Sequence, residues 1–163
     1  MLVKLKRALL GTLMLAHSAS AQTPGEWRYT INTDLSNIPV EMRVNFPTIT
    51  FSTCRSAEDF ASGRAFALQT LASSAERCPS NEFVRTRMAD GTGDALTFAY
   101  ACDGGKTLAG SGAGRVQPLR FTLALQSRYA LPVGGVAGVN QTMTGTHIGP
   151  CKVKPNADVM KVQ

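Results

Sequence analysis

Apolar and polar residues alternate with a period of two along much of the chain. The pattern is clearest in three runs, whose apolar members are Trp27, Tyr29 and Ile31, then Val40, Met42, Val44 and Phe46, and finally Leu119, Phe121, Leu123 and Leu125. Such alternation places apolar side chains on one face and polar ones on the other, as half-buried antiparallel strands require. Further strands are expected over 48–54, 81–89, 94–102, 106–113 and 138–148. The pattern predicts a mainly β protein: a single antiparallel sheet of about 7–8 strands, curved or barrel-like.

One segment has helical spacing instead. Ser56 is a typical N-cap residue, and the acids Glu58 and Asp59 follow in what would be the first turn. The apolar residues after them recur every three or four positions until Pro79 closes the stretch. We therefore expect one helix over about 56–75, packed by its apolar stripe on the sheet.

The first 21 residues have the pattern of a signal peptide. Lys4, Lys6 and Arg7 precede a short apolar stretch over 8–16, and the small residues of 19–21 match a cleavage site. A retained amphipathic helix or membrane anchor is the alternative, but the stretch is far shorter than the ~20 residues that span a bilayer. The sequence predicts a periplasmic or secreted bacterial protein with one mature domain over 22–163, whose residues 152–163 form a flexible tail.

Four cysteines, Cys54, Cys78, Cys102 and Cys151, lie in the predicted mature chain. An even number of cysteines in an exported domain favours two disulfides. A zinc site is the alternative, but there is no C-x-x-C pair and His147 is the only histidine after the leader. We expect two disulfides, no bound metal and no cofactor.

Geometry ranks the possible cysteine pairs. The expected helix would hold Cys54 and Cys78 ~30 Å apart, whereas a disulfide needs Cα atoms within about 7 Å. A turn over 90–93 lies midway between Cys78 and Cys102, so a hairpin centred on it would bring these two together. The prediction is Cys78–Cys102 and, by elimination, Cys54–Cys151.

The register of this hairpin also assigns side chains to faces. In it Val84 lies opposite Leu96, on the same face as the two cysteines. Phe83, Arg85 and Arg87 then point to the other face. A solvated strand face is the expected role of the two arginines, and a small anion contact is the alternative.

Composition and charge exclude several classes of protein. With 44% hydrophobic and 17% charged residues, the chain has the composition of a globular domain. The leader holds three of the 17 basic residues and none of the 11 acidic ones, so its removal lowers the net charge from +6 to +3. Without a basic cluster, nucleic acid is not an expected partner. No later segment is apolar enough to span a membrane.

No residue pattern points to catalysis. There is no G-x-S-x-G motif, and His147 is expected to be a structural histidine on a strand, with a catalytic role as the alternative. Asp90 and Asp94 bracket a Gly-Thr-Gly segment and fit a tight turn better than a calcium loop. The glycines of 110–114 lack the spacing of a phosphate loop and are typical of a bulge, a bend or the close approach of another backbone within a strand. We therefore expect no catalytic residues.

The order of landmarks resembles a known family. Pro24-Gly25-Glu26-Trp27 follows the leader, Cys54 precedes an acidic helix start, Cys78 and Cys102 flank a hairpin, and the chain closes on Gly145-Thr146-His147-Ile148-Gly149-Pro150-Cys151. Over about 24–151 this order is similar to a bacterial exported family known as domain of unknown function 3617. The resemblance implies a small exported protein and lends no activity and no catalytic residues.

Two functions fit these observations. The alternating strands, the expected helix and an apolar glycine-rich loop over 131–138 favour a non-enzymatic cell-envelope module that binds a small apolar or amphipathic ligand. The alternative is a protein–protein interaction module, an inhibitor or escort of an envelope enzyme, because disulfide-linked β domains present rigid loops. A hydrolase or isomerase is the least favoured class.

Overall fold

The computed structural model describes residues 22–66 and 80–152. The strands are β1 (Gly25–Thr33), β2 (Ile49–Arg55), β3 (Ser80–Arg87), β4 (Asp94–Cys102), β5 (Leu108–Gln117), β6 (Arg120–Val133) and β7 (Val136–Gly149). The helical segments are α1 (Ala57–Ala61) and the 3₁₀ turns η1 (Val40–Asn45), η2 (Arg64–Phe66) and η3 (Asp103–Gly105). The predicted signal peptide, and the predicted tail beyond Lys152, lie outside the described residues.

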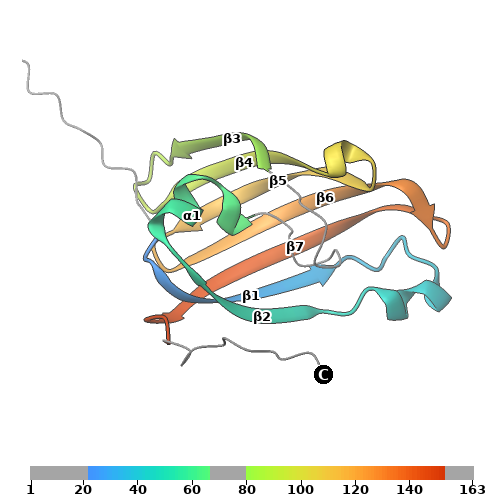
Figure 1. Cartoon of the computed structure of the whole chain (residues 1–163), viewed down its shortest axis with the longest axis horizontal. Helices are drawn as coiled ribbons and strands as arrows, with labels where there is room; N and C mark the ends of the chain where they lie inside the picture. Colours follow the sequence, from blue (N-terminus) through green and yellow to red (C-terminus); the bar gives the residue numbers. More distant parts are fainter. Residues whose placement is uncertain (1–21, 67–79, 153–163) are drawn as a thin grey trace, which may run out of the picture.

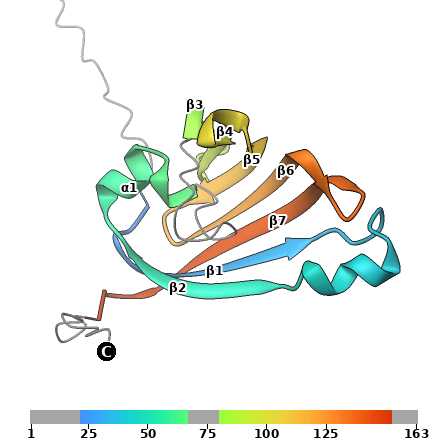
Figure 2. The same cartoon turned by 45° about the vertical axis from the view of Figure 1, so that its right-hand side comes forward.

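All seven strands belong to one antiparallel sheet in the order β2-β1-β7-β6-β5-β4-β3 (Figure 1). The prediction of a single antiparallel sheet is therefore confirmed. The sheet is curved but not closed, since β2 and β3 are its edges and no ladder joins their described residues. Figure 2 shows this curvature, with α1 on the concave side. In the part of the chain that the structure describes, no helix is long and apolar enough to cross a membrane.

The hydrophobic core lies on the concave face of the sheet. Trp27, Tyr29 and Ile31 of β1 are buried there, as the period-two pattern predicts. The segment after β2 packs two aromatic rings onto this face. Phe60 lies 5.0 Å from Trp27, and Phe66 lies 5.2 Å from Phe121, measured between ring centroids. Aromatic pairs at such distances stabilise a core beyond the area that they bury.

Glycines in β5 make room for rings of the neighbouring strand. A Cβ atom at Gly112 would collide with the Phe98 ring, and one at Gly110 would collide with the Tyr100 side chain and the Gln126 carbonyl. The rings can therefore lie flat across β5 towards β6, where the Tyr100 hydroxyl is 2.6 Å from Ser127 Oγ. The glycines of 110–114 therefore mark a close approach within a strand, here of aromatic side chains as well as of another backbone.

The helix is much shorter than predicted. Ser56 and Asp59 form the expected capping box, but α1 ends at Ala61. Gly63 then adopts φ +78°, and the Phe83 ring occupies the space that a Cβ there would need. The prediction of a helix over about 56–75 is confirmed at its start and is wrong for residues 62–66, where the left-handed Gly63 interrupts the helix. Its remaining residues lie outside the described part of the chain.

Two other segments also differ from their predictions. Val40–Asn45 alternates like a strand but forms η1, with Pro39 at its N-cap and i→i+3 hydrogen bonds to the Pro39 and Arg43 carbonyls. The flanking Pro39 and Pro47 lack the N–H groups that a strand ladder uses. Residues 131–138 form no loose loop, because β6 and β7 continue into them and leave only Gly134 and Gly135, both at positive φ, as a tight turn.

The β3–β4 hairpin has a bulge that the sequence does not reveal. Ser80 lies opposite Tyr100, in the predicted register, but the register shifts by one residue between Asn81 and Val84. Val84 therefore faces Thr97 rather than Leu96, and its side chain is exposed. The predicted assignment of side chains to the two faces of β3 is reversed beyond the bulge.

One disulfide, rather than the predicted two, is found among the described residues. It is Cys54–Cys151, with a Cα–Cα distance of 5.6 Å, and it joins the end of β2 to the residues after β7. This is the pair that elimination predicts. Cys78 lies outside the described residues, so the Cys78–Cys102 pair stays a prediction.

Candidate functional site

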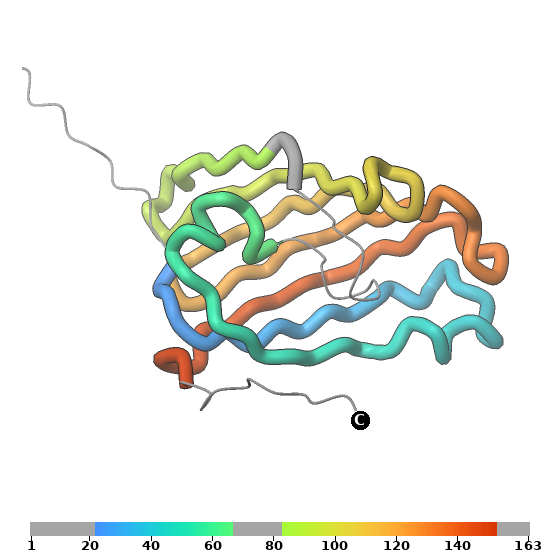
Figure 3. The backbone as a smooth tube through the Cα atoms, viewed as in Figure 1, coloured from blue at the N-terminus to red at the C-terminus, as the bar shows by residue number. Residues whose placement is uncertain are grey.

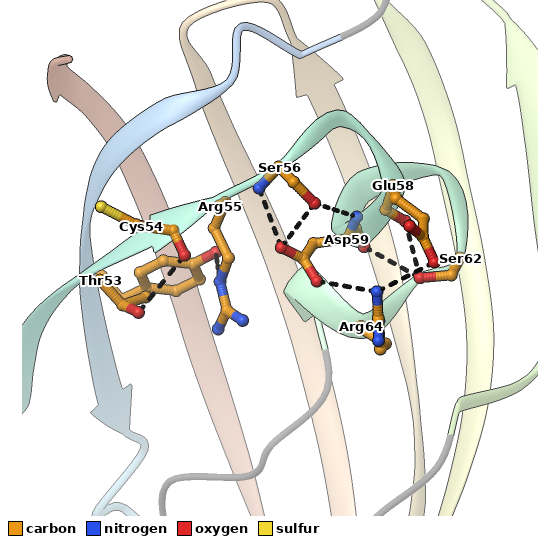
Figure 4. Close-up of polar contacts among 9 residues, drawn as sticks. Thr53, Cys54, Arg55, Ser56, Glu58, Asp59, Ser62 and Arg64 are labelled. Atoms are coloured by element: carbon orange, nitrogen blue, oxygen red, sulfur yellow. Dashed lines mark hydrogen bonds and ion pairs between the residues drawn. The ribbon is translucent and has the colours of Figure 1, made fainter. Parts of the chain in front are cut away.

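Arg55 is the last residue of β2, and its side chain lies on the concave face against Tyr29. The guanidinium carbon is 5.2 Å from the centre of the Tyr29 ring, a cation–π distance. Its Nε donates a hydrogen bond of 3.0 Å to the Tyr29 hydroxyl (Figure 4). The Tyr29 hydroxyl in turn donates to the Ala65 carbonyl at 3.0 Å. Burial raises the pKa of Tyr29, although the charge of Arg55 acts in the opposite direction. Tyr29 therefore remains a neutral hydroxyl that fixes the orientation of Arg55.

The two terminal nitrogens of Arg55 make no hydrogen bond or ion pair with any described residue. Asp59 is close enough for the charge of Arg55 to help lower its pKa, but the largest cause is the hydrogen bond from the Ser56 backbone. The carboxylate of Asp59 is already bonded to Ser56 N and Oγ at 2.9 Å each and paired with Arg64 at 3.3 Å (Figure 4). Arg55 is thus a half-buried cation with two donor groups available.

The inward side chains of β2 form a graded strip along this edge of the sheet. Ile49, Phe51, Thr53 and Arg55 are all half-buried, whereas the residues between them are exposed on the outer face. Phe51 stacks on Tyr29 at 4.9 Å between ring centroids. From Ile49 to Arg55 the concave edge thus changes from apolar to polar to cationic. We call these four residues the β2 strip.

Arg55 also borders a hollow of about 550 Å³ that is open to solvent. The hollow lies beside the Cys54–Cys151 disulfide, with Gly25 on one side and Ser56 on the other. It gives solutes access to the region where the strip meets the start of α1.

The His147 side chain packs against the core. Its ring lies edge-on to Trp27, 5.7 Å between centroids, and Nε2 is buried without a hydrogen-bond partner. No group of three or more His, Cys, Asp or Glu that could hold a metal is found among the described residues. The ring contact with Trp27 fits the structural role predicted for His147.

Arg85 and Arg87 are not on a solvated face, so that prediction is wrong. Because of the bulge in β3 they point to the core side, where Asp94 is 1% exposed. Arg85 Nε is 2.6 Å and Arg87 Nη1 is 3.3 Å from the Asp94 carboxylate. Asp94 is therefore an ion-pair partner rather than a turn residue.

The predicted turn role is correct for Asp90. Its carboxylate accepts hydrogen bonds from the backbone N–H and the hydroxyl of Thr92, which lower the pKa of Asp90. It is also paired with Arg115 at 2.7 Å. These contacts explain Asp90 without a bound calcium ion.

A groove of about 600 Å³ crosses the outer face of β5, β6 and β7. Exposed polar side chains line it, including Ser111, Gln126, Arg128 and Asn140, together with Asp34 from the segment after β1. The groove is shallow and open, and the described part of the chain contributes no buried titratable group to it. It has the character of a hydrated strand surface.

Large apolar side chains are exposed at the end of the molecule away from α1. They are Val40 and Val44 of η1, 73% and 80% exposed, and Leu131 and Val133 next to the β6–β7 turn, 80% and 49% exposed. Figure 3 shows η1 and this turn at the same end, and Met42 occupies the space beside Gly134 that a side chain there would need. We call Val40, Val44, Leu131 and Val133 the apolar end.

Sequence reasoning missed Arg55. The available signal was its position: it ends the alternating run of β2 with a charged residue in phase with Ile49 and Phe51. That phase became meaningful only once the topology placed β2 beside β1 at an open edge.

The described residues form a disulfide-linked domain with one open, curved antiparallel sheet whose concave face is aromatic. Residues 22–151 match the family described as "Protein of unknown function (DUF3617)", and the chain belongs to this family. No curated protein and no solved structure matches it.

Proposed function

We propose that the mature protein is a non-enzymatic module of the bacterial cell envelope that binds a small apolar or amphipathic ligand on the concave side of its sheet. The observation that carries the proposal is the β2 strip, in which half-buried apolar residues lie at an open edge and end on a cation. Export to the envelope is supported by the signal-peptide pattern of residues 1–21.

The strip offers apolar surface in a position that a ligand can cover. Ile49 and Phe51 pack with one side against the core, and the rest of each side chain remains accessible. Burying a fully exposed side chain of this size is worth ~1.5–3 kcal/mol, and a ligand on the strip gains the fraction that corresponds to the surface still accessible. Because β2 is an edge strand, its concave side is flanked by a neighbouring strand on one side only. A ligand can therefore enter from that edge without separating two strands.

The contacts of His147 support a role other than catalysis. A general base needs a partner within hydrogen-bond reach of its free nitrogen. Nε2 of His147 is instead buried beside Gly25, and the ring rests on Trp27. His147→Gln is expected to leave ligand binding unchanged.

A titration with a neutral apolar dye tests the proposal. N-phenylnaphthylamine fluoresces more strongly in apolar surroundings, and we expect the mature protein to bind it saturably. Phe51→Thr should weaken the binding, whereas the matched control Val44→Thr, at the apolar end, should not. Saturable binding that is equal in both variants would move the site away from the strip, and absence of saturable binding would refute the proposal.

Native mass spectrometry of the protein recovered from its own host gives an independent readout. A native mass that exceeds the denaturing mass by a discrete amount is expected, and the excess identifies the ligand. The denaturing mass of the same sample also reports cleavage after residue 21. Equal native and denaturing masses would count against a resident ligand.

The apolar end favours a second candidate function, an interaction module that binds an envelope protein. Single exposed apolar residues are ordinary, but several at one end of a small domain are typical of an interface. A photo-crosslinker at position 131, compared with one at the likewise exposed Val84 of β3, tests this candidate; the two side chains are 80% and 54% exposed. One defined crosslinked protein at position 131 and none at position 84 would favour it, and identical patterns would exclude it.

A further inference from the structure

The structure also points to the chemistry of the ligand, an inference that rests on the proposed function. We propose that the ligand is a single-chain amphiphile with an anionic head group, a carboxylate or a phosphate. The guanidinium of Arg55 binds the head group, and the chain lies along Phe51 and Ile49 of the β2 strip. The inference is carried by the two available nitrogens of Arg55 and by the polarity of the strip that leads to them.

Arg55 is preorganised to bind an anion. Its Nε is held by the Tyr29 hydroxyl at 3.0 Å and its guanidinium lies over the Tyr29 ring, so the plane of the group is fixed by two contacts. Figure 4 shows Nη1 and Nη2 extending from the ribbon with no dashed contact. A planar guanidinium binds a carboxylate or phosphate through two parallel hydrogen bonds, and an already oriented one loses little conformational freedom in doing so.

The nearby acids Glu58 and Asp59 form their ion pairs with Arg64 and not with Arg55. Asp59 is bonded to Ser56 and Arg64, as described above, and Glu58 is paired with the same Arg64 at 3.2 Å. Arg64 thus pairs with both α1 acids, and neither acid forms an ion pair with Arg55. A half-buried arginine in this setting gains most from an anion supplied by a ligand.

The strip also fits the rest of an amphiphile. Thr53 lies between Arg55 and Phe51, so polarity falls steadily with distance from the cation. Ile49 and Arg55 are six residue steps apart along the extended strand, which corresponds to a length of ~20 Å. This span accommodates an extended alkyl chain, and its apolar part begins at Phe51, four residues before the head-group site.

The test compares ligands that share a chain and differ in the head group. Dodecanoate, dodecyl phosphate and dodecanol compete with the neutral dye for the wild-type protein, for Arg55→Gln and for Arg28→Gln. Arg28 is the matched control, because it is an exposed arginine on the outer face of the adjacent β1, and its substitution removes the same charge. Charge-assisted hydrogen bonds predict that dodecanoate binds the wild type about tenfold or more tightly than dodecanol does.

Arg55→Gln should abolish this preference while leaving dodecanol affinity unchanged, and Arg28→Gln should retain it. Arg55→Lys keeps the charge without the planar fork and should keep only part of the preference. Tyr29→Phe should have a similar partial effect, because it removes the hydroxyl that orients Nε. Binding of dodecanoate and dodecyl phosphate, each relative to dodecanol, tells which of the two anions is preferred.

The outcomes separate the two proposals. If dodecanol and dodecanoate bind the wild type equally, or if Arg55→Gln keeps the preference, the anionic head group is refuted while apolar binding stands. If the dye does not bind saturably, the proposed function fails, and the anionic head group with it. Circular dichroism of each variant verifies that the sheet is intact, and Arg55→Lys supplies the answer if Arg55→Gln does not fold.

Discussion

Replacement of Asp94 by asparagine tests the most deeply buried ion pair that the structure describes. Asp94 opens β4, is 1% exposed, and faces Arg85 Nε at 2.6 Å and Arg87 Nη1 at 3.3 Å. Asp94→Asn keeps the size of the side chain and removes its charge. Both guanidinium groups then lose the carboxylate against which they are packed.

The exposure of the partners sets the magnitude. Removing one member of a fully buried ion pair destabilises a protein by about 3–5 kcal/mol. The Arg85 side chain is 17% exposed and that of Arg87 is 42% exposed, so water can partly solvate both charges in the variant. We therefore expect a loss of about 2–3 kcal/mol in the free energy of unfolding. For a domain of this size that corresponds to a Tm lower by about 8–12 °C.

Urea unfolding followed by Trp27 fluorescence measures this loss. Trp27 is the only tryptophan of the chain and is fully buried, so its emission reports the core. Asp90→Asn is the matched control, because Asp90 lies in the same hairpin and pairs with Arg115 at the surface. Exposed pairs contribute little, so its midpoint should change far less. Equal losses in the two variants would refute the assignment of Asp94 to the core face and the hairpin register behind it.

Three further predictions concern stability. The Cys54–Cys151 disulfide closes a loop with a sequence separation of 97, for which chain entropy gives an upper value of ~4.7 kcal/mol. The double Cys→Ser variant should therefore lose about 2–4 kcal/mol in urea unfolding, and an unchanged midpoint would contradict this. Gly112→Ala should lose about 1–3 kcal/mol, because its new methyl group overlaps the Phe98 ring. Adding Phe98→Leu should recover part of that loss, and a fully additive double variant would argue against the overlap. Asp59 has a pKa lowered from its ordinary 3.8 by the hydrogen bonds of the helix N-cap, so its stabilisation is complete above that value and is lost as the pH falls through the lower folded pKa. Asp59→Asn should therefore have a smaller difference between its urea midpoints at neutral and acidic pH than the wild type.

The strands were predictable because alternation and burial follow the same rule. Trp27 and its in-phase neighbours are buried, and the predicted strand over 94–102 matches β4. The sheet could be predicted because each strand buries one face only. The family resemblance was equally readable, since it rests on short motifs and on the order of the cysteines.

The errors came from single residues that change the direction of the chain. One extra residue between Asn81 and Val84 reverses the faces of β3, and no pattern in the sequence marks it. Gly63 ends the helix in a left-handed conformation, although helical spacing continues beyond it. In both places a local backbone conformation overrides a periodicity that extends over a longer segment.

The site was harder to predict than the fold because its meaning depends on topology. Arg55 is in phase with apolar residues and Arg28 is not, but an arginine that ends an alternating run is usually solvated, so the phase alone does not predict a binding role. The difference arises when β1 pairs with both β2 and β7, which places Arg55 on the concave side over Tyr29. The sequence of one strand shows which side chains share a face. To locate a binding edge, one also needs the order of all the strands in the sheet.

The position of Arg55 in the chain connects the disulfide with the proposed site. Its two neighbours are each constrained: Cys54 is bonded to Cys151, and Ser56 forms the capping box of α1 with Asp59. A cation between two such constraints needs little further ordering when an anion binds, so the disulfide should contribute to head-group affinity as well as to stability. The double Cys→Ser variant, measured at a temperature at which it remains folded, should therefore lose affinity for dodecanoate while its affinity for dodecanol stays near that of the wild type. Equal loss for both ligands would mean that the disulfide supports the whole strip, and no loss for either would mean that the contacts with Tyr29 alone hold Arg55 in place.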